Sequence, residues 1–278
     1  MVEISAELVK QLRLATNVSM MECKKALTDA QGDIEKATRL LRERGVAMAA
    51  KKATRATNQG LVASHVTPDG KTVSLIEVNC ETDFVARNPT FQAFVREMAE
   101  KAAATDGSIT AEARDKIVAK VTEIGENITV RRNTRYTLQG TGRLGSYIHM
   151  GGKIGVIVEA GCQKPATVDS PMFKDLIRDL TLHIAASRPQ YKDPSEIPAD
   201  VVKSEREIYA KQVQGKPANV LEKIVDGKMR KFHEEICLLQ QPFVKEPKQS
   251  ITQVVQAVEK ALADTIAIRR FAVYQLGA

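Results

Sequence analysis

The N-terminal part of the chain has the apolar spacing of a three-helix unit. One stripe recurs every four residues, at Ile4, Leu8 and Leu12. Ser19–Glu22 has the S-x-x-E spacing of a capping box and opens a second helix. Gly32 ends that helix, and Asp33 can cap a third, which we expect to end near Gly45. The pattern predicts an N-terminal domain over residues 1–54.

A repeat follows, in which residues 60–104 align with residues 142–186 without gaps. Eleven of the forty-five positions are identical, whereas background composition predicts roughly three. Two copies of one supersecondary unit are therefore expected. The identical pairs are Gly60/Gly142, Ser64/Ser146, Gly70/Gly152, Lys71/Lys153, Glu77/Glu159, Cys80/Cys162, Pro89/Pro171, Phe91/Phe173, Arg96/Arg178, Ala103/Ala185 and Ala104/Ala186.

Each copy has the pattern of a hairpin followed by a helix. Gly70-Lys71 and Gly152-Lys153 are turn signals between β-rich runs. Asn88-Pro89 and Ser170-Pro171 place a capping residue before a proline, which is typical of a helix start. Apolar residues then recur at helical spacing in both copies. Antiparallel hairpins that are each covered by a helix predict an α+β core.

The remaining segments complete this core and add an insertion. We expect a helical or extended linker from Ala47 to Gly60, a helix from Ala111 to Ile124 and strands near 128–136 and 266–274. Two polar helices, near 199–213 and 217–232, predict a projecting antiparallel hairpin with a seam of Val201, Ile208, Leu221, Ile224 and Phe232. The predicted domains are residues 1–54, a first core copy at 55–140, a second at 141–188 and 233–278, and an inserted coiled coil at 189–232.

Composition narrows the classes of function. The net charge of +7 suits acidic partners, including acidic proteins, RNA and ribosomes. A well-solvated surface with no such partner explains the charge equally well. Trp is absent and aromatics are scarce, so stacking platforms for single-stranded nucleic acid are few. The four cysteines lack metal-ligand spacing, which favours reduced, buried thiols in a cytosolic protein. The sequence has neither a signal-peptide pattern nor an apolar run of membrane-spanning length.

No segment predicts catalysis, a metal site or a cofactor. Gly140–Gly145 matches G-x-G-x-x-G, but it leads into a predicted strand, so no helix N-terminus faces a phosphate. The P-loop pattern fails near Gly152-Lys153, because no Ser or Thr follows. The four histidines have no partners at ligand spacing. We expect a protein that is not an enzyme.

The two copies differ most between the hairpin and its helix. Glu81–Arg87 (ETDFVAR) shares no residue with its counterpart, Gln163–Asp169. The segment places the Phe84 ring beside the Asp83 carboxylate, and on a rigidly framed loop this pair could act as a wedge that enters a partner's pocket. The alternative is that Phe84 packs beneath its own helix.

Several blocks in this chain resemble the elongation factor Ts family and occur in that family's order. The blocks are Leu12–Lys25 (LRLATNVSMMECKK), Ala26–Thr28, Gly32–Ile34, Glu77–Ala86 (EVNCETDFVA), Ile124–Ile128 (IGENI), Arg131-Arg132 and Gln241–Val244 (QPFV). The resemblance covers residues 1 to about 275. It implies a guanine-nucleotide exchange factor of translation elongation, with elongation factor Tu as its protein partner and no membrane, nucleic-acid or small-molecule partner of its own.

The resemblance also implies site residues. A ubiquitin-associated-like N-terminal bundle would dock on the partner's GTPase domain through Leu12, Met20 and Met21, although all three could instead form the bundle core. Adjacent methionines cannot face the same way on a helix, so at least one should be exposed. His149 would contact a more distant domain of the partner.

The stretch Thr82, Asp83, Phe84 and Val85 matches the family loop that displaces the partner's nucleotide-bound magnesium. Family members often continue past the point that corresponds to Ala278 into a helical module. The runner-up function is a basic RNA- or ribosome-associated protein, suggested by the charge and by Arg131, Arg132 and Arg135.

Overall fold

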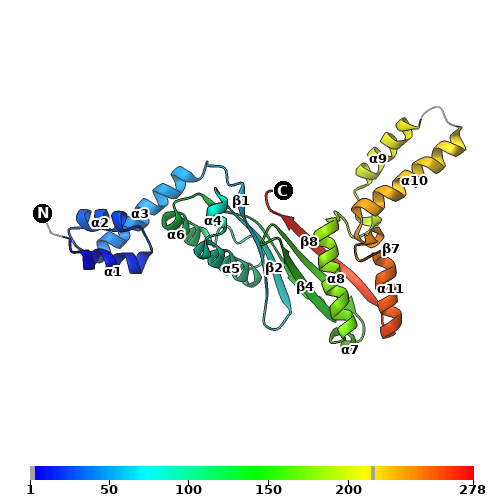
Figure 1. Ribbon diagram of the computed structural model, residues 1–278, viewed down its shortest axis with the longest axis horizontal. Coiled ribbons are helices and arrows are strands. Elements are labelled where there is room, and N and C mark those ends of the chain that lie inside the picture. Colours follow the sequence, from blue (N-terminus) through cyan, green and yellow to red (C-terminus); the bar gives the residue numbers. More distant parts are fainter. Residues whose placement is uncertain (1–3, 214–216) are drawn as a thin grey trace.

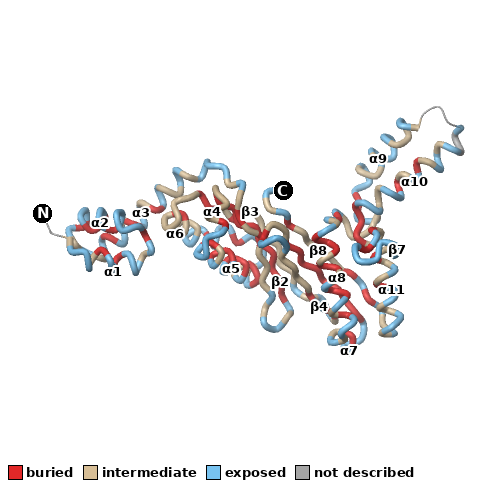
Figure 2. The backbone as a smooth tube through the Cα atoms, in the orientation of Figure 1, coloured by how far each residue is buried: buried red, intermediate tan, exposed pale blue. Residues whose placement is uncertain are grey.

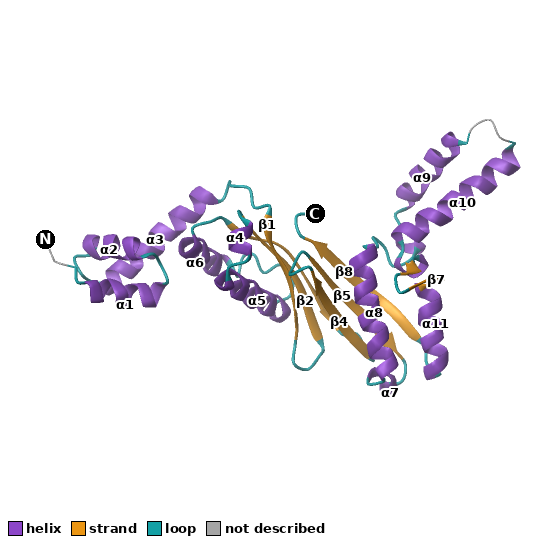
Figure 3. Cartoon of the chain, viewed as in Figure 1, coloured by secondary structure: helices purple, strands orange, loops and turns teal. Residues whose placement is uncertain are grey.

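The computed structural model describes residues 4–213 and 217–278, and its shape is elongated (Figure 1). Three helices lie at one end, two three-stranded antiparallel sheets occupy the middle, and a pair of helices projects at the other end (Figures 1 and 3). The mixture of helices and antiparallel sheets confirms the α+β prediction.

The N-terminal helices are α1 (Ala6–Thr16), α2 (Met20–Asp29) and α3 (Ile34–Lys52). The predicted N-caps are confirmed: Ser19 Oγ accepts from Glu22 N at 3.3 Å, and Asp33 Oδ1 accepts from Lys36 N at 3.0 Å. At Ser19 this is one of the two bonds of the expected capping box. These bonds satisfy backbone donors that the first turn of a helix leaves free. The bundle core consists of Val9, Leu12, Val18, Cys23, Ala26, Leu27, Ala30, Ala37 and Leu41.

The expected end of the third helix near Gly45 is wrong, because α3 continues to Lys52. Gly45 is buried inside the helix, where a Cβ would lie 2.5 Å from Thr122 Oγ1. Thr122 belongs to α6 (Arg114–Ile124), so the glycine permits close helix packing rather than ending α3. Helix α6 itself begins at Arg114, later than the predicted Ala111.

The repeat is confirmed as a pair of equivalent sheets. The first has the order β1 (Gln59–Val66), β2 (Thr72–Cys80), β3 (Ile128–Thr137), and the second β4 (Gly142–His149), β5 (Ile154–Cys162), β8 (Ile266–Gln275). Helix α5 (Pro89–Ala104) covers one face of the first sheet, and α8 (Pro171–Ser187) covers one face of the second. The other faces pack together through Val62, Val73, Leu75, Leu144, Ile157 and Tyr274. Burial is accordingly concentrated along the central strands (Figure 2).

A buried acid lies at the centre of each sheet. Glu77 on β2 and Glu159 on β5 are 0% exposed. Arg132 Nε lies 2.7 Å from Glu77 Oε2, and Arg270 Nε lies 2.7 Å from Glu159 Oε2. Each acid also pairs with a second arginine, Glu77 with Arg131 and Glu159 with Arg269. Ionised groups are retained in a protein interior when such partners compensate their lost hydration.

The two sheets also contact each other through equivalent pairs of residues. The Arg132 guanidinium stacks 4.3 Å from the Tyr274 ring, and the Arg270 guanidinium lies 4.2 Å from the Tyr136 ring. The chain after β8 donates Gly277 N–H to Glu77, and the chain after β3 donates a backbone N–H to Glu159 in the same way. This reciprocity shows an internal pseudo-twofold arrangement that holds the sheets together.

The projecting pair comprises α9 (Ala199–Gln212) and α10 (Ala218–Ile236), after the short 3-10 helix η1 (Pro194–Glu196). The predicted seam is only partly correct: Ile208 is 45% exposed, whereas Val225 and Met229 are buried. The chain then returns through η2 (Leu238–Gln240), β6 (Pro242–Phe243), β7 (Glu246–Ser250) and α11 (Ile251–Leu262) to β8.

His183 on α8 is a satisfied core histidine. Its Nε2 lies 2.9 Å from Gln241 Oε1, and its Nδ1 accepts from Val244 N at 3.3 Å. Both nitrogens are therefore occupied in the neutral ring, and a proton on Nδ1 would face another donor. Burial lowers the pKa of His183 from its ordinary value.

We predict that His183 makes folding sensitive to acid. The unfolded chain binds a proton at about pH 6.5 whereas the folded chain resists it, so stability is lost as the pH falls through this value. The thermal midpoint of the wild type should fall more than that of His183→Gln between neutral and mildly acidic pH. An equal fall of the thermal midpoint in the wild type and in His183→Gln would contradict the role of His183 in acid sensitivity.

Candidate functional site

The segment that distinguishes the first copy is a single helical turn, α4 (Asp83–Ala86), between β2 and α5. It is a helix rather than the expected loop. Thr82 is its N-cap, and the Thr82 hydroxyl accepts from Val85 N at 3.3 Å. Ala86 is buried and Val85 packs against the first sheet's core, so one side of the turn is fixed against the body.

Phe84 points away from that core. Its side chain is 82% exposed, the largest exposure among the large apolar residues that the structure describes. The alternative that Phe84 packs beneath its own helix is wrong. Burial of a phenylalanine side chain is favourable by about 1.5–3 kcal/mol, so the free chain leaves most of that free energy available for a partner pocket.

Asp83 lies beside the exposed ring. Its Oδ2 is 2.9 Å from Arg87 Nη2, one helical turn later, and its side chain remains 46% exposed. The pair thus presents a carboxylate next to an apolar ring at the molecular surface. Exposed pairs of this kind contribute little to folding, so the acid remains available to a partner's polar groups.

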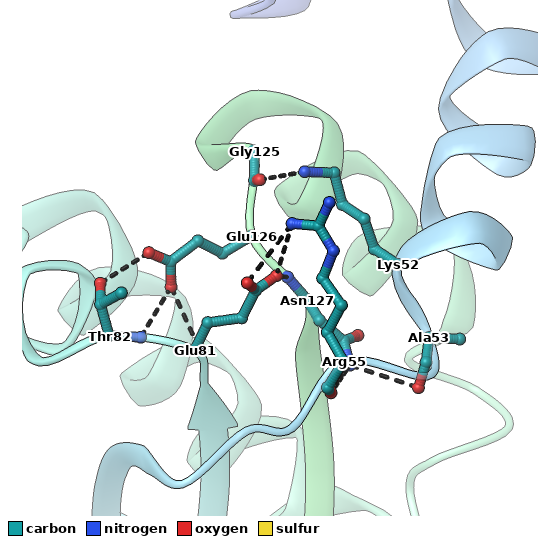
Figure 4. Close-up of polar contacts among 8 residues, drawn as sticks. All are labelled: Lys52, Ala53, Arg55, Glu81, Thr82, Gly125, Glu126 and Asn127. Atoms are coloured by element: carbon teal, nitrogen blue, oxygen red, sulfur yellow. Dashed lines mark hydrogen bonds and ion pairs between the residues drawn. The ribbon is translucent and has the colours of Figure 1, made fainter.

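The base of α4 is held by the turn before β3 (Figure 4). Glu126 Oε2 accepts from the backbone N–H groups of Glu81 and Thr82, both at 3.0 Å. Glu126 Oε1 accepts from the Thr82 hydroxyl at 2.6 Å. Burial raises the pKa of the nearby Cys80 thiol to about 12, and the Glu126 charge adds to this effect, so that thiol stays protonated.

The same turn is joined to the end of the N-terminal bundle (Figure 4). Asn127 Nδ2 donates to the carbonyl of Arg55 at 2.9 Å, and Lys52 donates to the carbonyl of Gly125. The backbone N–H of Asn127 donates to Glu81 Oε1 at 2.6 Å, and this bond lowers the pKa of Glu81. The segment after α3, the base of α4 and the start of β3 therefore meet in one junction.

The second copy contains the same backbone device without the ring. Helix α7 (Pro165–Val168) occupies the position of α4, although the two sequences share no residue. Asp264 before β8 accepts from the backbone N–H groups of Gln163 and Lys164 and from the Thr167 hydroxyl. Ala166 stands at the repeat position of Phe84. The local fold is thus shared, and the exposed aromatic side chain is what distinguishes α4.

The structure places His149 at the same end of the sheets as α4. His149 is exposed at the end of β4, and its Nδ1 lies 2.8 Å from the Tyr147 hydroxyl. Lys153, in the following turn, reaches Gln59 at the start of β1, which pairs with Cys80 at the end of β2. The His149 turn and the strand that leads into α4 are therefore neighbours.

The predicted N-terminal contact residues differ in exposure. Met20 and Met21 are 41% and 74% exposed, which confirms that at least one methionine faces solvent. Leu12 is 0% exposed and belongs to the bundle core. The alternative that Leu12 forms part of the bundle core therefore describes the free chain, in which its side chain packs α1 and offers no surface for the predicted contact with a partner. Leu14 is 74% exposed on the same helix and had not been predicted.

The glycine-rich run is explained by strand packing. It leads into a strand, as predicted, but β4 begins within the run at Gly142, where a Cβ would lie 2.3 Å from the Ala160 carbonyl oxygen. Gly60, its repeat partner, has the same relation to the Val78 carbonyl oxygen, at 2.2 Å. Both glycines have positive φ, which other residues rarely adopt. The run permits close backbone approach within each hairpin.

Comparison with known proteins identifies the family. The family model described as elongation factor TS matches residues 81–278. The chain belongs to the elongation factor Ts family. An elongation factor Ts from a Nitratiruptor species is 44% identical, with 99% of this chain and 93% of that relative aligned. Those of Nitratidesulfovibrio vulgaris and Nautilia profundicola are each 40% identical, over 99% and 100% of this chain and 96% and 94% of the relatives.

The sequence indicates only part of this candidate site. Glu126 and Asn127 stood within a recognised block, but no spacing rule connected them to Thr82 or Arg55. The sequence signal for the role of Glu126 is its counterpart in the second copy: Asp264 stands two residues before β8, as Glu126 stands two residues before β3. Within residues 4–213 and 217–278, no helix has both the length and the apolar character needed to cross a membrane.

Proposed function

We propose that this chain is a guanine-nucleotide exchange factor for elongation factor Tu. The observation that carries the proposal is the 82% exposure of Phe84 on a turn whose base is held by several hydrogen bonds. A ring held out from a fixed support can enter a partner pocket without first losing much conformational freedom. Membership of the elongation factor Ts family supports the identity of the partner.

The proposed mechanism is displacement of the partner's nucleotide-bound magnesium. Phe84 and Asp83 would disturb the groups that hold the ion, with Thr82 and Val85 fixing their backbone. Magnesium neutralises phosphate charge, so its loss weakens the partner's hold on GDP. The factor must bind the nucleotide-free partner more tightly than the nucleotide-bound one, and by reciprocity an incoming GTP expels the factor.

The remaining parts have supporting roles in this proposal. The N-terminal helices, as a ubiquitin-associated-like bundle, would dock on the GTPase domain through Met20 and Met21. His149 would contact a more distant domain of the partner, and α9–α10 would form the family's coiled-coil insertion. The factor would act in the cytoplasm without a cofactor and without catalysing a chemical reaction of its own.

The RNA-binding alternative has less support. Arg131 and Arg132 form ion pairs with the buried Glu77, and Arg135 donates to the Ala103 carbonyl and pairs with Asp106. Cations that are paired within the fold are poorly placed to neutralise phosphates. The three arginines that suggested RNA binding are better explained by the architecture of the core.

The direct test uses elongation factor Tu loaded with fluorescent GDP. Addition of this protein should accelerate GDP release many-fold, with a rate that rises and then saturates as the factor concentration increases. Release at the spontaneous rate at every concentration would refute the proposal. Steeply salt-dependent RNA binding in its place would favour the alternative function.

A further inference from the structure

Glu126 is the point at which the junction meets α4 (Figure 4). Both of its carboxylate oxygens are occupied by donors from the base of this turn, two backbone N–H groups and the Thr82 hydroxyl. Glu126 is only partly buried and does not belong to the exposed Asp83–Phe84 pair. Its contacts determine how the preceding strand turns into α4.

The Thr82 hydroxyl transmits this influence to the helix. Because its proton is donated to Glu126, its oxygen lone pairs face Val85 N and cap the turn. A single turn has no intrinsic stability, since helix nucleation is unfavourable. The direction in which α4 presents Phe84 therefore depends on this cap and on the packing of Ala86 and Val85.

The backbone that carries the Glu126 carboxylate is also held in place. Gly125 accepts from Lys52, and Asn127 bonds to Glu81 and to the carbonyl of Arg55. Glu126 is thus anchored on both sides by residues that connect to α3 and β2. A change at Glu126 should alter α4 while the remaining junction contacts persist.

We propose that Glu126 is a positioning residue for nucleotide exchange, which acts by fixing the orientation of Phe84. The inference rests on the proposed function and assigns Glu126 no contact with the partner. Glutamine at this position would keep the shape but replace one acceptor oxygen by an NH2 donor. If that group faced Thr82, the hydroxyl could no longer donate there and its proton would have to turn elsewhere. If the amide were reversed, the group would face the two backbone N–H donors of Glu81 and Thr82. Either arrangement weakens the support that holds the Thr82 cap in place.

The chain contains a matched control. Asp264 makes the corresponding three bonds at the base of α7, where Ala166 replaces the aromatic ring. Asp264→Asn removes the corresponding carboxylate in the second copy, where it holds two backbone N–H groups and the Thr167 hydroxyl of α7, a turn that has no side-chain N-cap. It should therefore leave exchange unchanged if Glu126 acts through Phe84.

The test measures GDP release from elongation factor Tu as a function of factor concentration. Glu126→Gln should lower the maximal release rate by about tenfold, the effect of losing one charge-assisted hydrogen bond, because a misdirected ring is less effective. The half-saturating concentration should change by less than about threefold, since the other docking surfaces are intact. Asp264→Asn should match the wild type in both quantities, and circular dichroism should show all variants folded.

A double variant separates positioning from general destabilisation. Glu126→Gln added to Phe84→Ala should cause little further loss, because residues that act as a unit are not additive. A full tenfold further loss would overturn the proposal, as would an unchanged release rate in Glu126→Gln alone.

A second measurement does not depend on exchange activity. Hydrogen exchange at the Val85 and Ala86 amides should be at least about tenfold faster in Glu126→Gln than in the wild type or Asp264→Asn. Unchanged protection would overturn the positioning role even if exchange fell. If the wild type itself fails to accelerate GDP release, the proposed function fails, whereas faster amide exchange would still show that Glu126 sets α4.

Discussion

Phe84→Ala is expected to lower the maximal rate of GDP release from elongation factor Tu by roughly 30-fold, which corresponds to about 2 kcal/mol. The ring is 82% exposed in the free chain, so most of its burial free energy can appear only in the complex. The release assay with fluorescent GDP measures this loss directly. The free chain should unfold at the same temperature as the wild type, because the ring contributes little to the core.

Two comparisons make this result specific to Phe84. Met172→Ala removes another exposed apolar side chain, 45% exposed at the start of α8, and should leave release unchanged. Phe84→Leu should retain part of the activity, since it keeps some of the apolar surface. Equal release by Phe84→Ala and the wild type would remove the central support for the mechanism.

Glu77→Gln is expected to lower the free energy of unfolding by about 3 kcal/mol. Glu77 is fully buried and accepts from Arg131, Arg132, Asn79 and the backbone of Gly277. The substitution removes the negative charge that compensates two partly buried arginines. Because the chain has no Trp, unfolding in urea is best followed by circular dichroism.

The pseudo-twofold arrangement supplies the comparison for this second result. Glu159→Gln should destabilise by a similar amount, since Glu159 makes the equivalent contacts with Arg269, Arg270 and the backbone of Gln139. Asp115→Asn, which breaks a highly exposed pair with Arg42, should have no measurable effect. If Glu77→Gln proved as stable as the wild type, the network would be incidental to folding.

Local patterns predicted most of the elements. The two hairpins, the helices that follow Asn88-Pro89 and Ser170-Pro171, and the final strand all agree with the structure, because turn, cap and apolar periodicity act over a few residues. Gly45 was misread because glycine ends helices in isolation, whereas here it makes room for Thr122 of a distant helix. The seam of α9 and α10 was predicted only in part for the same reason, since tertiary packing leaves Ile208 exposed and buries Val225 and Met229.

The sequence by itself determined the family, the duplication and the identity of the residues in the Thr82–Val85 stretch. Only the tertiary structure decided that Phe84 is exposed, that Leu12 is buried, and that Glu126 supports α4. The reason is the range of the interactions: Glu126 and Thr82 are 44 residues apart, and Gly277 and Glu77 are 200 apart. Periodicity reports which face of an element is apolar, whereas the contacts that orient a side chain toward a partner depend on how the two sheets and the bundle come together.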